Sequence, residues 1–203
     1  KAPVRTVLSG QYLPILLVNL LIVAGGGTAY YLSSGYLPTF LKIINELPAG
    51  TSSLVLMTIS IVSIVASGLV GYASEWLGRR KTMLITGIVC LIGFPFLYAR
   101  LAAATDVASV YFYASALAFL GNASYAPVLV FLNERFPTAI RSTGVGLSWN
   151  VGFAVGGMMP TFVSLASGSI ERIPATLGWF LAGIFVVYLI GALVVPETKG
   201  RFN

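Results

Sequence analysis

The chain has 203 residues, of which 57% are hydrophobic and only 9% are charged, and it contains no histidine. A soluble domain normally carries about 25% charged residues to keep its surface wetted. The composition therefore excludes an ordinary soluble globular domain and indicates an outer surface that faces lipid.

Six long stretches without charge follow one another between the charged residues of the chain. A helix needs about 20 apolar residues to cross the hydrocarbon core of a bilayer, so each stretch can hold one crossing. Runs such as 180–195 are apolar on every face, which suits helices and not the alternating strands of a β-barrel. The sequence therefore predicts an all-α integral membrane protein with six transmembrane helices, at about 11–41, 52–73, 82–99, 108–132, 142–166 and 176–196.

The first and fourth predicted helices share a short motif, 34–38 (SGYLP) and 123–127 (ASYAP). The first copy lies near the outer end of its helix and the second near the inner end, which is typical of two inverted three-helix repeats. A proline removes one backbone hydrogen bond and permits bending. Tyr36, Pro38 and Pro127 are therefore predicted to mark gates at which these helices bend.

Small residues recur every four positions in two of the predicted helices. The fifth helix carries the longer series, which consists of Gly144, Ser148, Gly152 and Gly156, and the second carries Ser63, Ser67 and Gly71. Such series lie on one helix face and let two backbones approach closely, which is how helices associate in lipid. We expect them to pack against neighbouring helices.

The connection after the second predicted helix, 71–81 (GYASEWLGRRK), combines glycines with charges. Gly71 allows close packing at the helix end, and Gly78 provides a tight turn. Glu75 can pair with the basic residues that begin at Arg79. Two further segments combine charges with turn residues, 133–144 (NERFPTAIRSTG) and the closing 196–201 (PETKGR).

Lys and Arg are distributed unequally between the two sides of the membrane. The side that holds the N-terminus carries nine of them, namely Lys1, Arg5, Arg79, Arg80, Lys81, Arg135, Arg141, Lys199 and Arg201. The other side carries Lys42, Arg100 and Arg172. Because cytoplasmic loops carry the excess of basic residues, both ends are expected in the cytoplasm. This bias also accounts for the net charge of +6, so no nucleic-acid partner is expected.

The three charged segments resemble signatures of the major facilitator superfamily. The segment 71–81 is similar to its loop signature, 133–144 to the connection between its tenth and eleventh helices, and 196–201 to its final cytoplasmic signature. The resemblance covers essentially the whole chain. It implies that 1–203 is the C-terminal half of a secondary transporter that works by alternating access, with helices seven to twelve, and that the N-terminal six-helix half is absent.

The resemblance also implies a role for the charged loops. In this superfamily such charges form a network that holds the cytoplasmic side closed and breaks when the inner gate opens. We therefore expect a cytoplasmic gate made of Gly71, Glu75, Gly78, Arg79, Glu134 and Arg141. Arg80, Lys81 and Arg201 are expected only to anchor the topology.

Two segments, 27–41 and 146–152, look like the metabolite–proton symporter branch, which moves organic acids and zwitterionic osmolytes together with protons. The closing 196–200 (PETKG) would equally suit the sugar porters. However, the seventh-helix glutamine pair of those porters is missing from 11–36, and Pro127 is not followed by their tryptophan. We expect proton-coupled symport of a small organic acid or zwitterionic metabolite, with a sugar-porter-like transporter as the alternative.

Polar side chains at mid-membrane depth need partners, so they are the first candidates for substrate contact. Asn150 lies about 12 Å into its predicted helix at roughly 1.5 Å per residue. The substrate-binding candidates are Tyr31, Asn122, Asn150, Tyr30, Trp149 and Tyr125. Each of them could alternatively pack between helices, which is the role expected for Asn19. No charge lies inside a predicted helix, so the absent half is expected to supply the proton-binding group.

No nucleophile–base pair, phosphate loop or metal cluster is recognisable, so we expect neither an enzyme nor a cofactor or metal. Cys90 lies in an apolar run and is expected to be an inert thiol. An aquaporin-type channel is disfavoured because 122–124 (NAS) does not match its signature. A non-transporting six-helix membrane receptor or scaffold remains as an alternative of another class. The expected location is a plasma membrane, such as a bacterial inner membrane, and the expected partners are the lipid bilayer, the absent half, a small-molecule substrate and protons.

Overall fold

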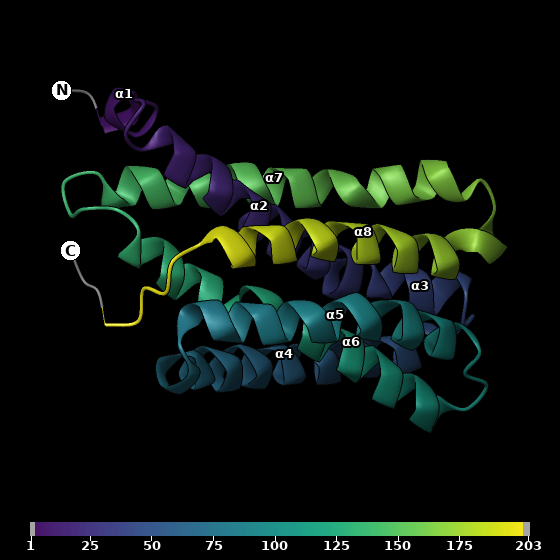
Figure 1. Cartoon of the computed structure of the whole chain (residues 1–203). Helices are drawn as coiled ribbons and strands as arrows, with labels where there is room; N and C mark the ends of the chain where they lie inside the picture. Colours follow the sequence, from purple (N-terminus) through teal and green to yellow (C-terminus); the bar gives the residue numbers. More distant parts are fainter. Residues whose placement is uncertain (1–2, 201–203) are drawn as a thin grey trace.

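The computed structural model describes residues 3–200, and these fold into a bundle of long helices joined by short connections (Figure 1). Lys1 and Arg201, which contribute to the charge bias, lie outside the described residues. The elements are α1 (Pro3–Val7), α2 (Leu13–Tyr30), the π-helical turn η1 (Tyr31–Gly35), α3 (Leu37–Ile43), α4 (Ala49–Leu77), α5 (Arg79–Ala102), α6 (Val107–Glu134), α7 (Arg141–Ser167), the 3₁₀ turn η2 (Ile170–Arg172) and α8 (Ile173–Val194). The start of α2, the α4–α5 turn, the α6–α7 connection and the end of α8 lie at the same end of the bundle (Figure 1).

The first expected helix is interrupted. Between α2 and α3 the chain makes the π-helical turn η1, after which α3 continues to Ile43. Pro38 is the second residue of α3, where the missing N–H of proline costs no intrahelical hydrogen bond. Short π-helical turns inside α-helices occur frequently at functional sites. The π-helical turn overlaps the first two residues of the SGYLP motif, 34–38.

Five segments of the described chain are long and apolar enough to cross a membrane, namely Leu13–Ile43, α4, α5, α6 and Ile170–Val194. The remaining long helix, α7, has 27 residues but is richer in glycine, serine and threonine, and it does not meet the same criterion. It packs mainly along α2 and makes only a small contact with α8. Five segments are therefore candidate crossings by length and composition, and the sixth crossing stays a prediction.

The glycines of α7 pack against the backbone of α2, as the four-residue spacing predicts. A Cβ atom on Gly156 would lie 2.5 Å from the carbonyl carbon of Gly27, and one on Gly152 would lie 2.5 Å from Cγ1 of Val23. Both separations are too short for any side chain, so only glycine permits this approach. In α4 the outcome is mixed, because Oγ of Ser63 accepts a hydrogen bond from Asn122 of α6, whereas a Cβ on Gly71 would meet no atom of the described chain within 4 Å.

The helices pack in a regular pattern of neighbours. The most extensive contacts join α5 to α8, α4 to α6, and α2 to α7, followed by α5 to α6 and α2 to α8. The core between them is apolar and includes Cys90, which is completely buried. The helix α4 is the least buried of the candidate membrane spans, so most of its surface faces outward from this bundle.

Candidate functional site

A cavity of about 520 Å³ lies between the interrupted first helix, α4 and α6. Its polar lining consists of hydroxyl and amide groups, from Tyr30, Ser34, Ser60, Ser63, Asn122 and Tyr125. Pro38, Leu56, Ile59 and Ile64 complete the wall. No charged residue lines this cavity, so it can recognise a ligand by shape and by neutral hydrogen bonds.

Asn122 of α6 is the centre of the polar lining. Its Nδ2 atom lies 2.7 Å from the carbonyl oxygen of Ala118, 2.8 Å from Oγ of Ser63 and 3.3 Å from Oγ of Ser34, so two N–H donors serve three acceptors. The hydroxyl of Tyr125 donates to Oδ1 of Asn122 at 2.7 Å. The amide therefore connects α4, η1 and α6 and fixes the direction of the Tyr125 ring.

An aromatic cluster, defined by Tyr30, Tyr31, Tyr125, Trp149 and Phe153, continues the cavity toward α7. The rings of Trp149 and Phe153 are stacked with centroids 4.2 Å apart, and Tyr125 meets both rings edge-on at 6.0 Å. Tyr30 lies 6.0 Å from Tyr125, and Tyr31 lies 6.1 Å from Phe153. Because Tyr125 also bonds to Asn122, the structure brings together five of the six substrate-binding candidates, all except Asn150, and adds Phe153. The sequence signal for Phe153 was its position four residues after Trp149 on the same helix.

Asn150 does not join these residues. Its side chain is exposed, and its Nδ2 atom donates to the carbonyl oxygen of Gly146 in its own helix at 2.8 Å. Depth along the helix was estimated from the sequence, but depth does not determine the face on which a residue lies. A role for Asn150 in binding therefore stays a prediction that depends on what covers this face of α7.

Two buried tyrosines form hydrogen bonds with the interrupted first helix and with α6. The hydroxyl of Tyr98 in α5 donates to the carbonyl oxygen of Leu32 in the π-helical turn, and that of Tyr188 in α8 donates to the carbonyl oxygen of Ser124 at 2.7 Å. Both tyrosines are completely buried. Ser124 lies three residues before Pro127, so each bond is made close to a predicted bending point. Sequence reasoning did not identify these tyrosines.

Arg79, the first residue of α5, is the centre of a buried charge network at the other end of the bundle. It is 1% exposed, and its Nη2 atom lies 2.6 Å from Oε1 of Glu75 and 2.9 Å from Oε1 of Glu134. Its Nη1 atom donates to Oγ of Ser74 at 2.9 Å. The hydroxyl of Thr198 donates to the other carboxylate oxygen of Glu134. The network joins the ends of α4 and α6, the start of α5 and the chain that follows α8.

Glu197 anchors that final segment to the start of α5. Its Oε1 atom accepts hydrogen bonds from the backbone amides of Arg79 at 2.8 Å and of Thr198 and Lys199 at 3.0 Å, and its Oε2 atom accepts one from the amide of Arg80 at 3.2 Å. Burial alone would raise the pKa of Glu197, but these backbone bonds hold it below the ordinary value of 4.5. A carboxylate at a helix N-terminus is also favoured by the helix dipole. Glu197 was not among the predicted gate residues.

Gly78 makes the turn between α4 and α5 with φ of 95° and ψ of 154°, a conformation that is essentially restricted to glycine. A Cβ on this residue would also lie 2.4 Å from Oε2 of Glu197. Arg141, at the start of α7, donates from Nε to the carbonyl oxygen of Phe136 at 3.2 Å. Of the predicted gate residues, Glu75, Gly78, Arg79 and Glu134 thus gather around one point.

The sequence comparisons match one family over almost the whole chain. A family model described as "Sugar (and other) transporter" matches residues 1–202. The relatives include the "Probable 4-methylmuconolactone transporter" of Cupriavidus pinatubonensis, 24% identical over 98% of this chain and 46% of that protein. The "Alpha-ketoglutarate permease" of Escherichia coli is 28% identical over 87% of this chain and 41% of that protein. The "Citrate-proton symporter" of Salmonella typhi is 23% identical over 82% of this chain and 38% of that protein. The chain spans less than half the length of these relatives.

Proposed function

This chain belongs to the sugar (and other) transporter family of the major facilitator superfamily, and we propose that it is the C-terminal half of a proton-coupled symporter for a small organic acid or zwitterionic metabolite. It is a membrane transporter and not an enzyme. The observation that carries the proposal is the cavity lined by Asn122, by serines and by Tyr30 and Tyr125, the two members of the aromatic cluster that face it. The names of the organic-acid relatives favour this substrate class, and the sugar-porter alternative is not better supported.

In many secondary transporters alternating access is built on inverted repeats, and we propose two three-helix units here, α2 to α5 and α6 to α8, with α7 as a sixth crossing. The packing pattern supports this arrangement. If the units are equivalent, α2, α4 and α5 correspond to α6, α7 and α8. The contact of α2 with α7 then corresponds to the contact of α6 with α4, and the contact of α5 with α6 corresponds to the contact of α8 with α2. The bonds from Tyr98 to Leu32 and from Tyr188 to Ser124 are exchanged in the same way.

In the proposed cycle, substrate enters the cavity, the interrupted first helix bends at Tyr36 and Pro38, and the continuous helix α6 bends at Pro127. The cytoplasmic gate, formed by Gly71, Glu75, Gly78, Arg79, Glu134 and Arg141, holds one end closed in one of the two states. A conformational equilibrium is balanced within a few kcal/mol, so a modest network is sufficient to bias it.

The cavity offers no group that binds and releases a proton near neutral pH. Within residues 3–200, charged side chains lie in connections or in the first or last turn of a helix. We therefore assign the proton-binding group, and a cation for a carboxylate substrate, to the half of the protein that is outside this chain. This half supplies shape, hydroxyl groups and amide groups.

The function is tested by uptake into proteoliposomes with an imposed pH gradient and labelled α-ketoglutarate, citrate and proline as probes. Residues 1–203 alone should insert without transport, and co-expression with the upstream half should restore transport that follows the gradient. Asn122→Ala should raise the KM for uptake of the substrate. Asn150→Ala should raise this KM only if the proposed other half brings this face of α7 to the cavity. Transport by 1–203 alone, or uptake indifferent to the gradient, would refute the proposal.

The proposed orientation puts both ends of the chain in the cytoplasm. In a Cys90→Ala background, a cysteine at the exposed Ser169 should react with a membrane-impermeant thiol reagent on intact cells, and a cysteine at the exposed Thr138 should not. The reverse pattern would invert the topology without affecting the transport proposal.

A further inference from the structure

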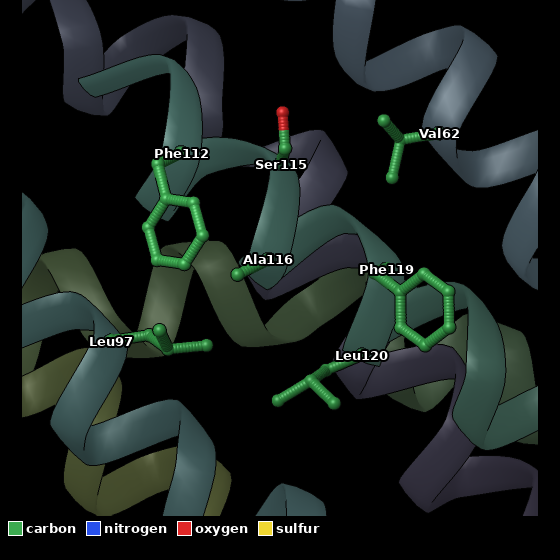
Figure 2. A pocket seen from close by; sticks show the side chains of 7 residues that line it. All are labelled: Val62, Leu97, Phe112, Ser115, Ala116, Phe119 and Leu120. Carbon is green, nitrogen blue, oxygen red and sulfur yellow. The ribbon is translucent and has the colours of Figure 1, made fainter. Parts of the chain in front are cut away.

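A second hollow, of about 370 Å³, lies between α4, α5 and α6. Val62 of α4 and Leu97 of α5 form its sides, and α6 forms its floor with Phe112, Ser115, Ala116 and Phe119 (Figure 2). The hydroxyl of Ser115 is the one side-chain polar group of this lining. We call this hollow the α6 groove. Its apolar surface is unsuited to a polar metabolite and suited to a hydrocarbon chain.

The α6 groove opens on a different face from the substrate cavity. Val62 is two residues from Ser60 and from Ile64, which line the cavity, and two residues correspond to a rotation of about 200° around a helix. In Figure 2 the rings of Phe112 and Phe119 lie on either side of the small Ala116, which leaves the floor of the groove low between them. Phe112 is 67% exposed. In a membrane-spanning bundle, an exposed apolar hollow of this kind is in contact with acyl chains.

The floor of the groove is closed where α5 meets α6. Leu120 continues the lining, and a Cβ on Gly93 of α5 would lie 2.7 Å from its Cδ1 atom. The glycine thus lets α6 approach α5 at the inner end of the groove. The groove therefore has a closed inner end and leads outward along α5 and α6.

A cation lies at the outer end. Arg100 follows Leu97 by three residues on α5, so the two side chains lie on neighbouring positions of one helix face. The Nε atom of Arg100 donates to the hydroxyl of Tyr113 at 3.2 Å, and the guanidinium carbon lies 5.7 Å from the centre of that ring. No ion pair of Arg100 is formed within residues 3–200. Its terminal nitrogens therefore form no ion pair with a carboxylate of these residues.

We propose that the α6 groove and Arg100 form a binding site for one glycerophospholipid, with an acyl chain in the groove and the phosphate on the guanidinium. Arginine presents parallel N–H donors that match two phosphate oxygens, and tyrosine is favoured at the level of the lipid headgroups. The phosphate belongs to the leaflet on the side of the α5–α6 connection. The site depends on the chain crossing the membrane and not on its substrate.

The acyl chain and the phosphate contribute unequally to the affinity of this site for a lipid. A lipid chain that moves from the bilayer into the groove exchanges one apolar environment for another, so the hydrophobic effect contributes little. Shape fit along Ala116 and the charge-assisted bonds to Arg100 therefore supply the preference for this site over bulk lipid. Loss of the cation should weaken binding more than loss of any single apolar contact.

The test uses the full-length protein, delipidated in detergent and titrated with palmitoyl-oleoyl phosphatidylglycerol or phosphatidylethanolamine under native mass spectrometry. One lipid should remain bound, and Arg100→Gln should reduce its retention by about tenfold or more, the equivalent of a lost charge-assisted bond. Arg172→Gln removes another cation from the same side of the bundle, away from the groove, and should leave retention unchanged. Equal retention by the two variants would overturn the proposal.

The groove itself is tested with a phosphatidylcholine that carries a photoactivatable diazirine on its acyl chain. In vesicles this lipid should label the peptide that contains 112–120, and Ala116→Phe, which fills the floor, should abolish the labelling while uptake persists. If that variant does not fold, Ser115→Leu adds bulk at the edge of the same groove and should reduce the labelling. Labelling spread evenly over the outward-facing helices, or unchanged by a variant that folds, would show that lipid has no preferred position there.

Discussion

Glu134→Gln is expected to disturb the charge network around Arg79 more than the neutralisation of any other acid in that network. The side chain of Glu134 is completely buried, as is its partner Arg79, whereas the side chain of Glu75 is 54% exposed. Removing one member of a buried ion pair costs about 3–5 kcal/mol because the other charge is left uncompensated, whereas an exposed pair contributes about 0–1 kcal/mol. Since Glu75 still contacts Arg79 in the variant, we expect the lower end, about 3 kcal/mol.

Hydrogen exchange at the α4–α5 turn reports this difference. The amides of Arg79 and Arg80 bond to Glu197, and the amide of Thr82 bonds to the carbonyl of Gly78, so all three exchange when the turn opens locally. In the full-length protein in lipid nanodiscs, a loss of about 3 kcal/mol corresponds to exchange about 150-fold faster. Neutralisation of the exposed partner should accelerate exchange by no more than about fivefold.

A double variant separates the charge effect from loss of packing. Arg79→Gln combined with Glu134→Gln leaves no buried charge uncompensated, so the turn should be more protected than in Glu134→Gln alone. If Glu134→Gln exchanged no faster than Glu75→Gln, the pair would not behave as a buried ion pair. The reasoning from burial would then fail.

Gly78→Ala should destabilise the turn by about 1–3 kcal/mol, because alanine is strained at this φ and ψ and its Cβ would displace Glu197; a lower thermal unfolding midpoint would show it. Folding lowers the pKa of Glu197, so its stabilising contribution is complete at neutral pH and is lost as the pH falls below about 4.5 through the folded pKa. Glu197→Gln should remove this acid dependence from thermal unfolding measured between pH 7 and pH 3. Tyr98→Phe and Tyr188→Phe each remove one hydrogen bond to a buried carbonyl, at a cost of about 0.5–1.5 kcal/mol. If the two repeats are equivalent, both should slow transport turnover to a similar extent with little change in KM, and unequal effects in uptake kinetics would contradict the equivalence.

The sequence was informative where the physics is local or strongly periodic. Helices cover the ranges that the charge-free stretches delimit, because a membrane span cannot tolerate charges near its middle. The spacing that includes Gly152 and Gly156 predicted a close approach of α7, because residues four apart share a face. The grouping of Glu75, Arg79 and Glu134 followed from the loop motifs.

What the sequence did not reveal depends on contacts between distant segments. Glu197 is 118 positions from Arg79, and nothing local indicates that its carboxylate meets the start of α5. The hydroxyls of Tyr98 and Tyr188 bond to carbonyls 66 and 64 positions away, so they looked like ordinary apolar core residues. For Asn150 the depth was estimated without the rotation of its helix, and rotation decides whether a side chain faces the cavity.

The positions of polar groups in this half separate two mechanical roles. At the end of the bundle that holds the α4–α5 turn, Arg79 and Glu197 connect the start of α5 to three other segments through charge-assisted hydrogen bonds. At the cavity, Asn122 and the π-helical turn are held by neutral hydrogen bonds, which are weaker and easier to exchange. A helix bundle that is held firmly at one end and by weaker bonds in the middle can rotate as one body while the first helix and α6 bend. Such a bundle responds to a change in charge that occurs elsewhere, which is why we assign the protonation step to the proposed N-terminal half of the protein.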